Sequence, residues 1–147
     1  MKVKNLKLLA TSNDDLRVIA AHLQDAIVSV QDIASLKKNR IFLIQLNRFM
    51  WEDVEKGVFR KNKRIRTMLK FDNVTSVLSK NINSKDSKNF LDFLTIENNL
   101  LPDKSYEIKL IFSGDSVIKI KAEVIDVTLD DQGSPWETKT QPRHDFL

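Results

Sequence analysis

The sequence predicts an α+β protein: a mainly antiparallel, strongly curved sheet, or a partly closed β-barrel, with one N-terminal amphipathic helix. Strand-like segments with short connections dominate, and they do not alternate with helices. The two most apolar segments, 40–51 and 66–79, each change the parity of their apolar spacing, near Asn47–Arg48 and near Asp72–Asn73. A β-bulge would produce such a change and would bend the sheet. An ordinary turn explains the change at Asp72–Asn73 equally well.

The N-terminal region predicts one strand and the helix. Residues 5–10 are expected to form a short strand, and Ser12-Asn-Asp-Asp15 has the form of a capping box with acidic groups in the first turn. Apolar residues then recur at i, i+3, i+4 and i+7, namely Leu16, Ile19, Ala20 and Leu23. This stripe predicts a helix that covers one side or one mouth of the sheet.

The remaining elements are expected to be strands. Short strands are predicted at 26–30 and 33–36, a turn at Lys38–Asn39, and a polar loop at 81–89. Residues 90–97 are apolar on both parities, which favours a central strand. The clearest element is a hairpin over 106–124, with a turn at 113–116 and the alternating, predicted buried residues Ile108, Leu110, Phe112, Ile118 and Ile120.

Composition indicates a single domain over residues 1–133 with a C-terminal tail over 134–147, because the periodicity ends after Gly133. A chain of 147 residues is long enough to bury a core. The absence of cysteine excludes a disulfide framework and a thiolate nucleophile. No apolar run approaches the ~18 residues that cross a membrane, and the apolar stretch near the N-terminus is too short for a signal peptide. We therefore expect a cytoplasmic protein that does not associate with a membrane.

The positive charge of the chain is local. The net charge is +4, and without the five cations between 60 and 66 the chain would be close to neutral. Such a run can neutralise phosphates, and the aromatic residues Phe49 and Trp51 precede it on a predicted strand. The alternative is a solvated loop that protects an edge strand, with both aromatics in the core. The candidate residues for binding an anion or nucleic acid are Arg48, Arg60, Lys61, Lys63, Arg64 and Arg66.

Catalytic and metal sites are not indicated. No phosphate-binding loop, dinucleotide fingerprint, nucleophile elbow or zinc-protease motif occurs. His22 and Asp25 could form a metal site with His144 and Asp145 only if the tail folded back, and nothing in the spacing requires this. The neighbouring carboxylates Asp130–Asp131 would face opposite sides of a strand, so we interpret them as solvated turn residues. We expect no catalytic residue, no metal and no cofactor.

Several segments follow one another along the chain: Leu6-Lys-Leu-Leu-Ala10, Asp15-Leu16, His22-Leu-Gln-Asp-Ala26, Asn47-Arg-Phe49 with Trp51-Glu52, the basic run before Leu69-Lys-Phe71, and Pro142-Arg-His-Asp145. Together they resemble an uncharacterised family of small alphaproteobacterial proteins. In the basic run, lysines and Asn62 stand where the resemblance leads us to expect mostly arginines, which weakens a special role for guanidinium groups. The resemblance implies a bacterial cytoplasmic protein and assigns no catalytic or binding residue.

These observations favour a non-enzymatic binding or adaptor module. The first hypothesis is interaction with a protein partner, or self-association, through an exposed sheet edge or through the tail as a peptide arm. The alternative is binding of nucleic acid or another polyanion through the basic run 60–66.

Overall fold

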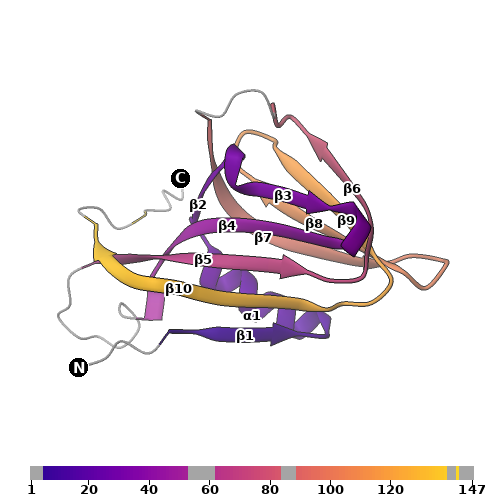
Figure 1. Ribbon diagram of the computed structural model, residues 1–147, viewed down its shortest axis with the longest axis horizontal. Coiled ribbons are helices and arrows are strands. Elements are labelled where there is room, and N and C mark those ends of the chain that lie inside the picture. The colour runs from indigo at the N-terminus through magenta and orange to yellow at the C-terminus, as the bar shows by residue number, and fades with distance from the viewer. Residues whose placement is uncertain (1–4, 53–61, 84–88, 139–141, 143–147) are drawn as a thin grey trace, which may run out of the picture.

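The computed structural model describes residues 5–52, 62–83, 89–138 and 142 (Figure 1). In this part of the chain lie ten strands, one α-helix and two short 3-10 helices. In chain order they are β1 (Lys7–Ala10), α1 (Asn13–Leu23), β2 (Ile27–Ser29), η1 (Val30–Asp32), β3 (Ile33–Leu36), η2 (Lys37–Asn39), β4 (Ile41–Phe49), β5 (Lys63–Phe71), β6 (Val74–Lys80), β7 (Phe90–Leu100), β8 (Tyr106–Phe112), β9 (Val117–Ala122) and β10 (Val127–Glu137).

The strands form one open antiparallel sheet. Its order is β1-β10-β5-β4-β2-β7-β8-β9-β6, and β3 also pairs with β4. Figure 1 shows β3, β4, β5, β10 and β1 side by side in a front layer, with β7, β8 and β9 behind them. The predicted α+β class, with a mainly antiparallel sheet and one helix, is therefore confirmed. The sheet does not close on itself, since β1 and β6 are its end strands.

The central strand β4 contains no bulge. Its pairing with β5 continues without a shift from Phe42↔Phe71 to Phe49↔Arg64. The bulge predicted at Asn47–Arg48 is thus wrong. The apolar alternation breaks because Arg48 occupies the next inward position after Phe42, Ile44 and Leu46, and all four side chains are buried.

The break at Asp72–Asn73 is a turn. Asn73 has a positive φ of 59°, and β5 ends before it while β6 begins after it. The two strands then separate, because β5 pairs with β4 and β10 whereas β6 pairs with β9. The turn passes the chain from one layer to the other, so it, rather than a bulge, explains the parity change.

The helix begins where the sequence predicts. Ser12 is the N-cap and its hydroxyl accepts a hydrogen bond from the Asp15 backbone N–H, at 3.2 Å. The Asp15 carboxylate accepts from the Thr11 backbone N–H, at 3.0 Å, so the reciprocal bond of the box is shifted by one residue. The stripe residues Leu16, Ile19 and Leu23 are buried and Ala20 is half-buried.

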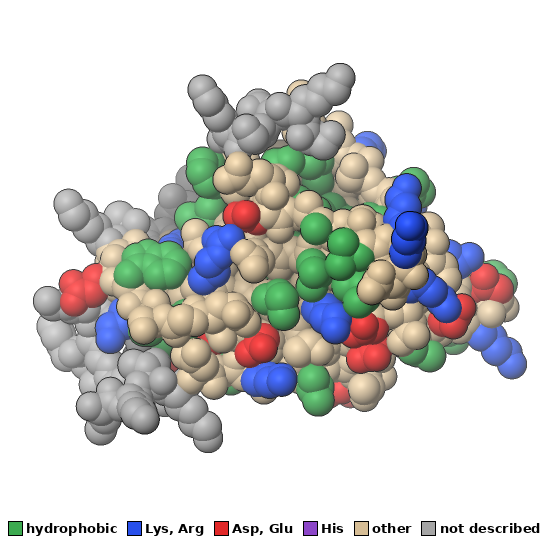
Figure 2. All heavy atoms as spheres, viewed as in Figure 1, with side chains coloured by type: hydrophobic (Ala, Val, Ile, Leu, Met, Phe, Trp, Pro, Cys, Tyr) green, Lys and Arg blue, Asp and Glu red, His purple; other side chains and the backbone are tan. Residues whose placement is uncertain are grey.

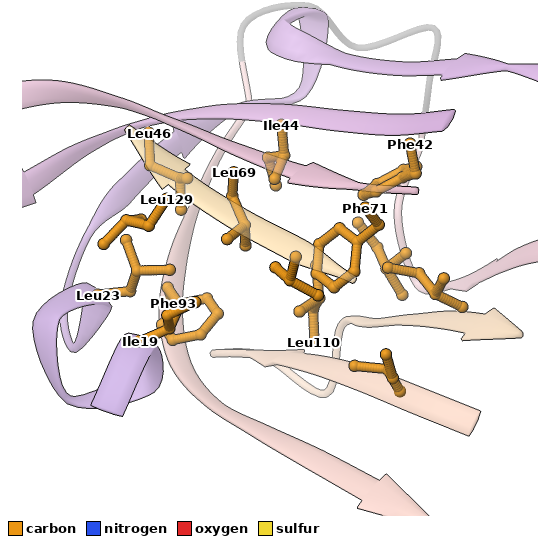
Figure 3. Close-up of a cluster of buried hydrophobic side chains, with 14 of the residues drawn as sticks. Ile19, Leu23, Phe42, Ile44, Leu46, Leu69, Phe71, Phe93, Leu110 and Leu129 are labelled. Carbon is orange, nitrogen blue, oxygen red and sulfur yellow. The ribbon is translucent and has the colours of Figure 1, made fainter. Parts of the chain in front are cut away.

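The core lies between the helix and the two layers of the sheet. Helix α1 packs against β7 and β1. Figure 3 shows Ile19 and Leu23 of the helix beside Phe93 and Leu129, with Ile44 and Leu69 further along the same cluster. The helix thereby covers one side of the sheet, as its apolar stripe predicts.

The predicted hairpin is confirmed. Strands β8 and β9 are antiparallel, and all five predicted core residues are buried: Ile108, Leu110, Phe112, Ile118 and Ile120. Strand β7 has neighbours on both edges, as expected for a central strand. However, its second apolar set faces solvent, with Phe90 and Leu94 68% and 42% exposed, because nothing in the described part of the chain covers that face.

The sheet extends beyond the predicted end of the domain. Strand β10 continues to Glu137, and Trp136 pairs with Arg64 after a register shift that begins at Gln132. The boundary at 133 is therefore corrected, because residues 134–137 belong to the sheet rather than to a tail. Gly133, with a φ of 72°, lies within this register shift, so the alternation of side chains does not continue through residues 134–137.

Candidate functional site

Arg48, the first predicted anion-binding residue, lies inside the protein. Its side chain is 1% exposed, and its Nε and Nη2 donate to the two carboxylate oxygens of Asp131, at 2.8 and 2.7 Å. Its Nη1 donates to Glu52, at 3.1 Å. A polyanion cannot reach this guanidinium, so Arg48 is removed from the candidate surface.

Asp131 is a buried acceptor rather than a solvated turn residue. Besides Arg48, its carboxylate accepts from the Thr67 hydroxyl at 2.8 Å and from the Leu6 backbone N–H at 3.0 Å. Burial works to raise the pKa of Asp131, but the hydrogen bonds and charge of Arg48, with the bonds from Leu6 and Thr67, hold that pKa below its usual value.

The same pairing acts on the arginine. Burial works to lower the pKa of Arg48, but its hydrogen bonds to Asp131 and Glu52 raise it above the usual value. The sequence contains a pattern from which this ion pair could be predicted. Arg48 and Asp131 each take the next inward position after an apolar series on their strands, and a buried charge requires a partner of opposite sign.

Two arginines of the basic run, Arg64 and Arg66, lie on the outer face of β5 and contact neighbouring segments. Arg64 Nη1 donates to the carbonyl oxygens of Asn47, at 3.0 Å, and of Asp25, at 3.3 Å. Its guanidinium also lies 5.8 Å from the centre of the Phe49 ring, and burial lowers its pKa. These contacts anchor the side chain to the protein.

Arg66 is likewise engaged. Its Nε donates to Gln45 Oε1 at 3.1 Å, and its Nη2 lies 3.2 Å from the Asp32 carboxylate. Lys63 begins β5, so the described part of the basic run is a paired strand rather than an exposed loop. Arg60 and Lys61 lie outside the described residues.

The aromatic residues beside the run belong mostly to the interior. Phe49 is buried, and Trp51 packs edge-on against it with the ring centres 4.6 Å apart. The indole N–H of Trp51 donates to the Gln24 carbonyl, at 2.8 Å. Phe49 is therefore a core residue, and the hydrogen bond fixes the half-buried Trp51 ring.

Of the two histidines of the chain, His22 lies among the described residues. The Nδ1 of His22 lies 2.9 Å from the Val18 carbonyl of its own helix, while His144 and Asp145 lie outside the described residues. Within the residues that the structure describes, no three His, Asp or Glu side chains are placed to hold a metal ion.

The most distinctive surface feature is a groove between β3 and β6, which we call the seam. It has a volume of about 270 Å³ and is lined by Ser35, Leu36, Lys37, Arg40, Ile41 and Val74–Val77. In the described part of the chain, β3 pairs only with β4 and β6 pairs only with β9. The seam therefore lies between two strands that each have one edge without a strand partner.

One end of the seam is closed. The Val74 backbone N–H at the start of β6 donates to the Arg40 carbonyl, at 2.9 Å. Strand β3 runs toward this point, through η2, and β6 runs away from it. In Figure 1 the two strands converge at the η2 end of the front layer and diverge from there. The seam thus widens from a hydrogen-bonded apex, formed by Arg40 and Val74.

The core is incompletely covered along the seam. Val77 of β6 pairs with Ile120, yet Val77 is only half-buried while Ile120 is fully buried. One row further from the apex, Ser79 is exposed although its partner Ile118 is buried. In the described part of the chain, no strand on the seam side of β6 covers its inward-facing side chains.

An apolar patch adjoins the seam on the outer face of the front layer. Its members are Ala34, Leu36, Ile41, Leu43 and Met68. They are neighbours because Ala34 pairs with Leu43 and Leu36 pairs with Ile41, while Met68 lies on the adjacent strand. Leu36 is 44% exposed, and Figure 2 shows hydrophobic side chains gathered over this part of the layer.

The fold and its surface define an α+β protein built on an open antiparallel sheet, and no helix in its described part is long and apolar enough to cross a membrane. The chain belongs to a family described as a protein of unknown function (DUF2948), whose model matches residues 6–144. The resemblance to an uncharacterised family is thereby confirmed. No curated protein and no solved structure matches the chain.

Proposed function

We propose that the protein is a non-enzymatic interaction module that binds an extended segment of another protein in the seam. The observation that carries the proposal is the pair of incompletely paired strands, β3 and β6, on the two sides of one groove. An added strand could pair with either edge or with both, which is a recurring mode of peptide recognition.

The surroundings of the seam support an extended peptide in particular. Successive side chains of a strand point to opposite faces. One set would complete the inward row beside the half-buried Val77, and the other would lie toward Leu36 and the apolar patch. Backbone hydrogen bonds would then give affinity, and the two apolar contacts would select aliphatic side chains.

The seam also needs an occupant for a physical reason. Unpaired strand edges promote aggregation, and proteins protect them with charge, bulges or a covering segment. The exposed residues of β3 are Ala34, Ser35 and Leu36, none of which is charged. Binding a partner strand would remove this edge from solvent.

The polyanion alternative is the weaker proposal. Of its six candidate residues, Arg48 is buried, and Arg64 and Arg66 are held by groups of the protein itself. A cation already engaged with the protein has fewer donors left for phosphates. We further propose the cytoplasm of a bacterium as the location, which the absence of cysteine supports.

Peptide selection tests the proposed function. Random decapeptides are displayed in two formats, with the random segment internal or at a free carboxyl end, and selected peptides are added to ¹⁵N-labelled protein. We expect the amide signals of β3 and β6 to shift most. Val77→Lys, which places a charge in the groove, should lower the affinity about tenfold or more.

Thr95→Lys is the control, because it introduces the same charge at an exposed strand residue of the rear layer that lies outside the seam. It should leave the affinity unchanged. Failure of both formats to yield a peptide would overturn the proposal. Shifts confined to another surface, or equal affinity for Val77→Lys and wild type, would do the same. Sedimentation of the free protein as a dimer held through β3 would instead identify a second copy as the occupant.

A further inference from the structure

We infer that the seam holds the free carboxyl end of its partner, with the terminal carboxylate at the closed apex beside Lys37 and Arg40. This inference rests on the proposed function and adds the chemical class of the bound segment and its direction. Three features carry it: the closure of the apex, the charge around it and the course of the two flanking strands.

The apex blocks a continuous strand. The bond from the Val74 N–H to the Arg40 carbonyl joins the two sides of the seam at this end. A strand that lies between β3 and β6 cannot continue past this bond without breaking it. The bound segment therefore ends at the apex or turns out of the groove there.

The charge at the apex favours a chain end that is negative. Lys37 and Arg40 line the seam, and Lys38 is exposed beside them. Arg40 is paired with Glu123, but within the described residues Lys37 and Lys38 have no carboxylate partner. A terminal carboxylate would be attracted to these ammonium groups, whereas a terminal amine would be repelled.

The direction of the bound strand follows from this placement. Strand β3 runs toward the apex and β6 runs away from it. A segment with its carboxyl end at the apex is consequently parallel to β3 and antiparallel to β6. Val77 lies three positions beyond Val74, so an aliphatic side chain should occupy the bound segment a few residues before its end.

The test compares a selected peptide that has a free carboxyl end with the same peptide carrying a carboxyl-terminal amide. For wild type we expect the amide to bind about fivefold more weakly, since ion pairs at exposed sites contribute modestly. For Lys37→Gln/Lys38→Gln the difference between the two peptides should shrink, because only Arg40, which is already paired with Glu123, remains beside the carboxylate. Lys7→Gln/Lys104→Gln, which changes two exposed lysines outside the seam lining, should behave as wild type.

The outcomes separate the two proposals. If acid and amide peptides bind wild type equally, and both shift the amides of β3 and β6, the inference about the carboxylate is wrong and the proposed function stands. Selection of internal peptides alone, bound at the seam, leads to the same conclusion. If no peptide of either format binds at the seam, both proposals fail. A bound peptide that nuclear Overhauser contacts place parallel to β6 would contradict the inferred direction.

Discussion

Arg48 and Asp131 form a two-point ion pair inside the sheet although 83 residues separate them in the sequence. They lie on β4 and β10, the two neighbours of β5, and Thr67 of β5 donates to the same carboxylate. The pair therefore connects three strands of the front layer from within the core. Asp131 compensates the buried charge of Arg48 together with Glu52, and Arg48 compensates the buried charge of Asp131.

Replacement of one partner should destabilise the protein strongly. Asp131→Asn leaves the buried Arg48 charge with the half-buried Glu52 as its remaining carboxylate partner, so we expect a loss toward the lower end of the about 3–5 kcal/mol that is typical for breaking a buried pair. Arg48→Met/Asp131→Leu removes both charges and should lie closer to wild type than the single variant. Urea unfolding measures both. Asp130→Asn, on the opposite face of the strand, is the control. A double variant with a lower free energy of unfolding than Asp131→Asn would contradict this account.

The same carboxylate makes stability depend on acid. The pKa of Asp131 in the folded protein lies below its ordinary value, so the unfolded chain takes up the proton first as the pH falls. The contribution of ionised Asp131 to stability is complete above the pKa that Asp131 has in the unfolded chain. It is lost as the pH falls through the lower pKa of the folded protein. Asp15 and Asp103, the latter with a pKa of about 2, act in the same direction.

We therefore expect the free energy of unfolding to fall between about pH 5 and pH 2 in wild type, and less steeply in Arg48→Met/Asp131→Leu. The difference between the two slopes isolates the pair, since Asp15 and Asp103 are present in both proteins. Unfolding at a series of pH values measures it. Parallel curves would mean that the pair contributes no pH dependence.

Two neighbouring cations of the basic run, Lys63 and Arg64, should differ in their effect on stability. Arg64→Ser removes the donor that serves the carbonyls of Asn47 and Asp25, which typically costs about 1–3 kcal/mol when the groups are partly buried. Lys63→Ser changes a surface cation and should stay within about 0.5 kcal/mol. Thermal unfolding compares them. Equal stability of both variants would indicate that water replaces the Arg64 donor without cost.

Oligonucleotide binding should not depend on the lysines of the run. Lys61→Ser/Lys63→Ser retains Arg64 and Arg66, so the fold should be preserved while the positive charge of the run falls by two. Under the proposed function, titration of a labelled single strand at two salt concentrations gives the same weak curves for this variant and wild type. A wild-type slope of log affinity against log salt that is steeper by about 0.7 per lost contact would instead support the polyanion alternative.

Local patterns predicted the elements that depend on local spacing. The α1 stripe and the β8–β9 hairpin follow directly from periods of 3.6 and 2. The sequence misleads where one residue interrupts a period: Arg48 suggests a bulge in β4, and Gly133 suggests the end of the last strand. The start of β5 was hidden for a related reason, because the outward Arg64 and Arg66 alternate with Ile65 and Thr67, and the charges dominated the interpretation.

The seam could not be predicted in the same way. It depends on which strands become neighbours, and β3 and β6 are brought together by the order of the sheet rather than by any pattern within them. The idea of an exposed edge came from the sequence, but the identity of the edge required the topology. The closing bond between Val74 and Arg40 is a tertiary contact with no local signal.

The position of β10 has a consequence for folding during synthesis on the ribosome. Of the described strands it is the last in chain order, yet it lies between β1, the first of them, and β5. Until residues 127–137 emerge, one edge of β5 has no neighbour and β1 has no strand to pair with. The front layer therefore completes only after residues 127–137 have emerged, and its long sequence separations slow folding. During that interval the nascent chain exposes an apolar edge, so it is most vulnerable to aggregation before its final strand arrives.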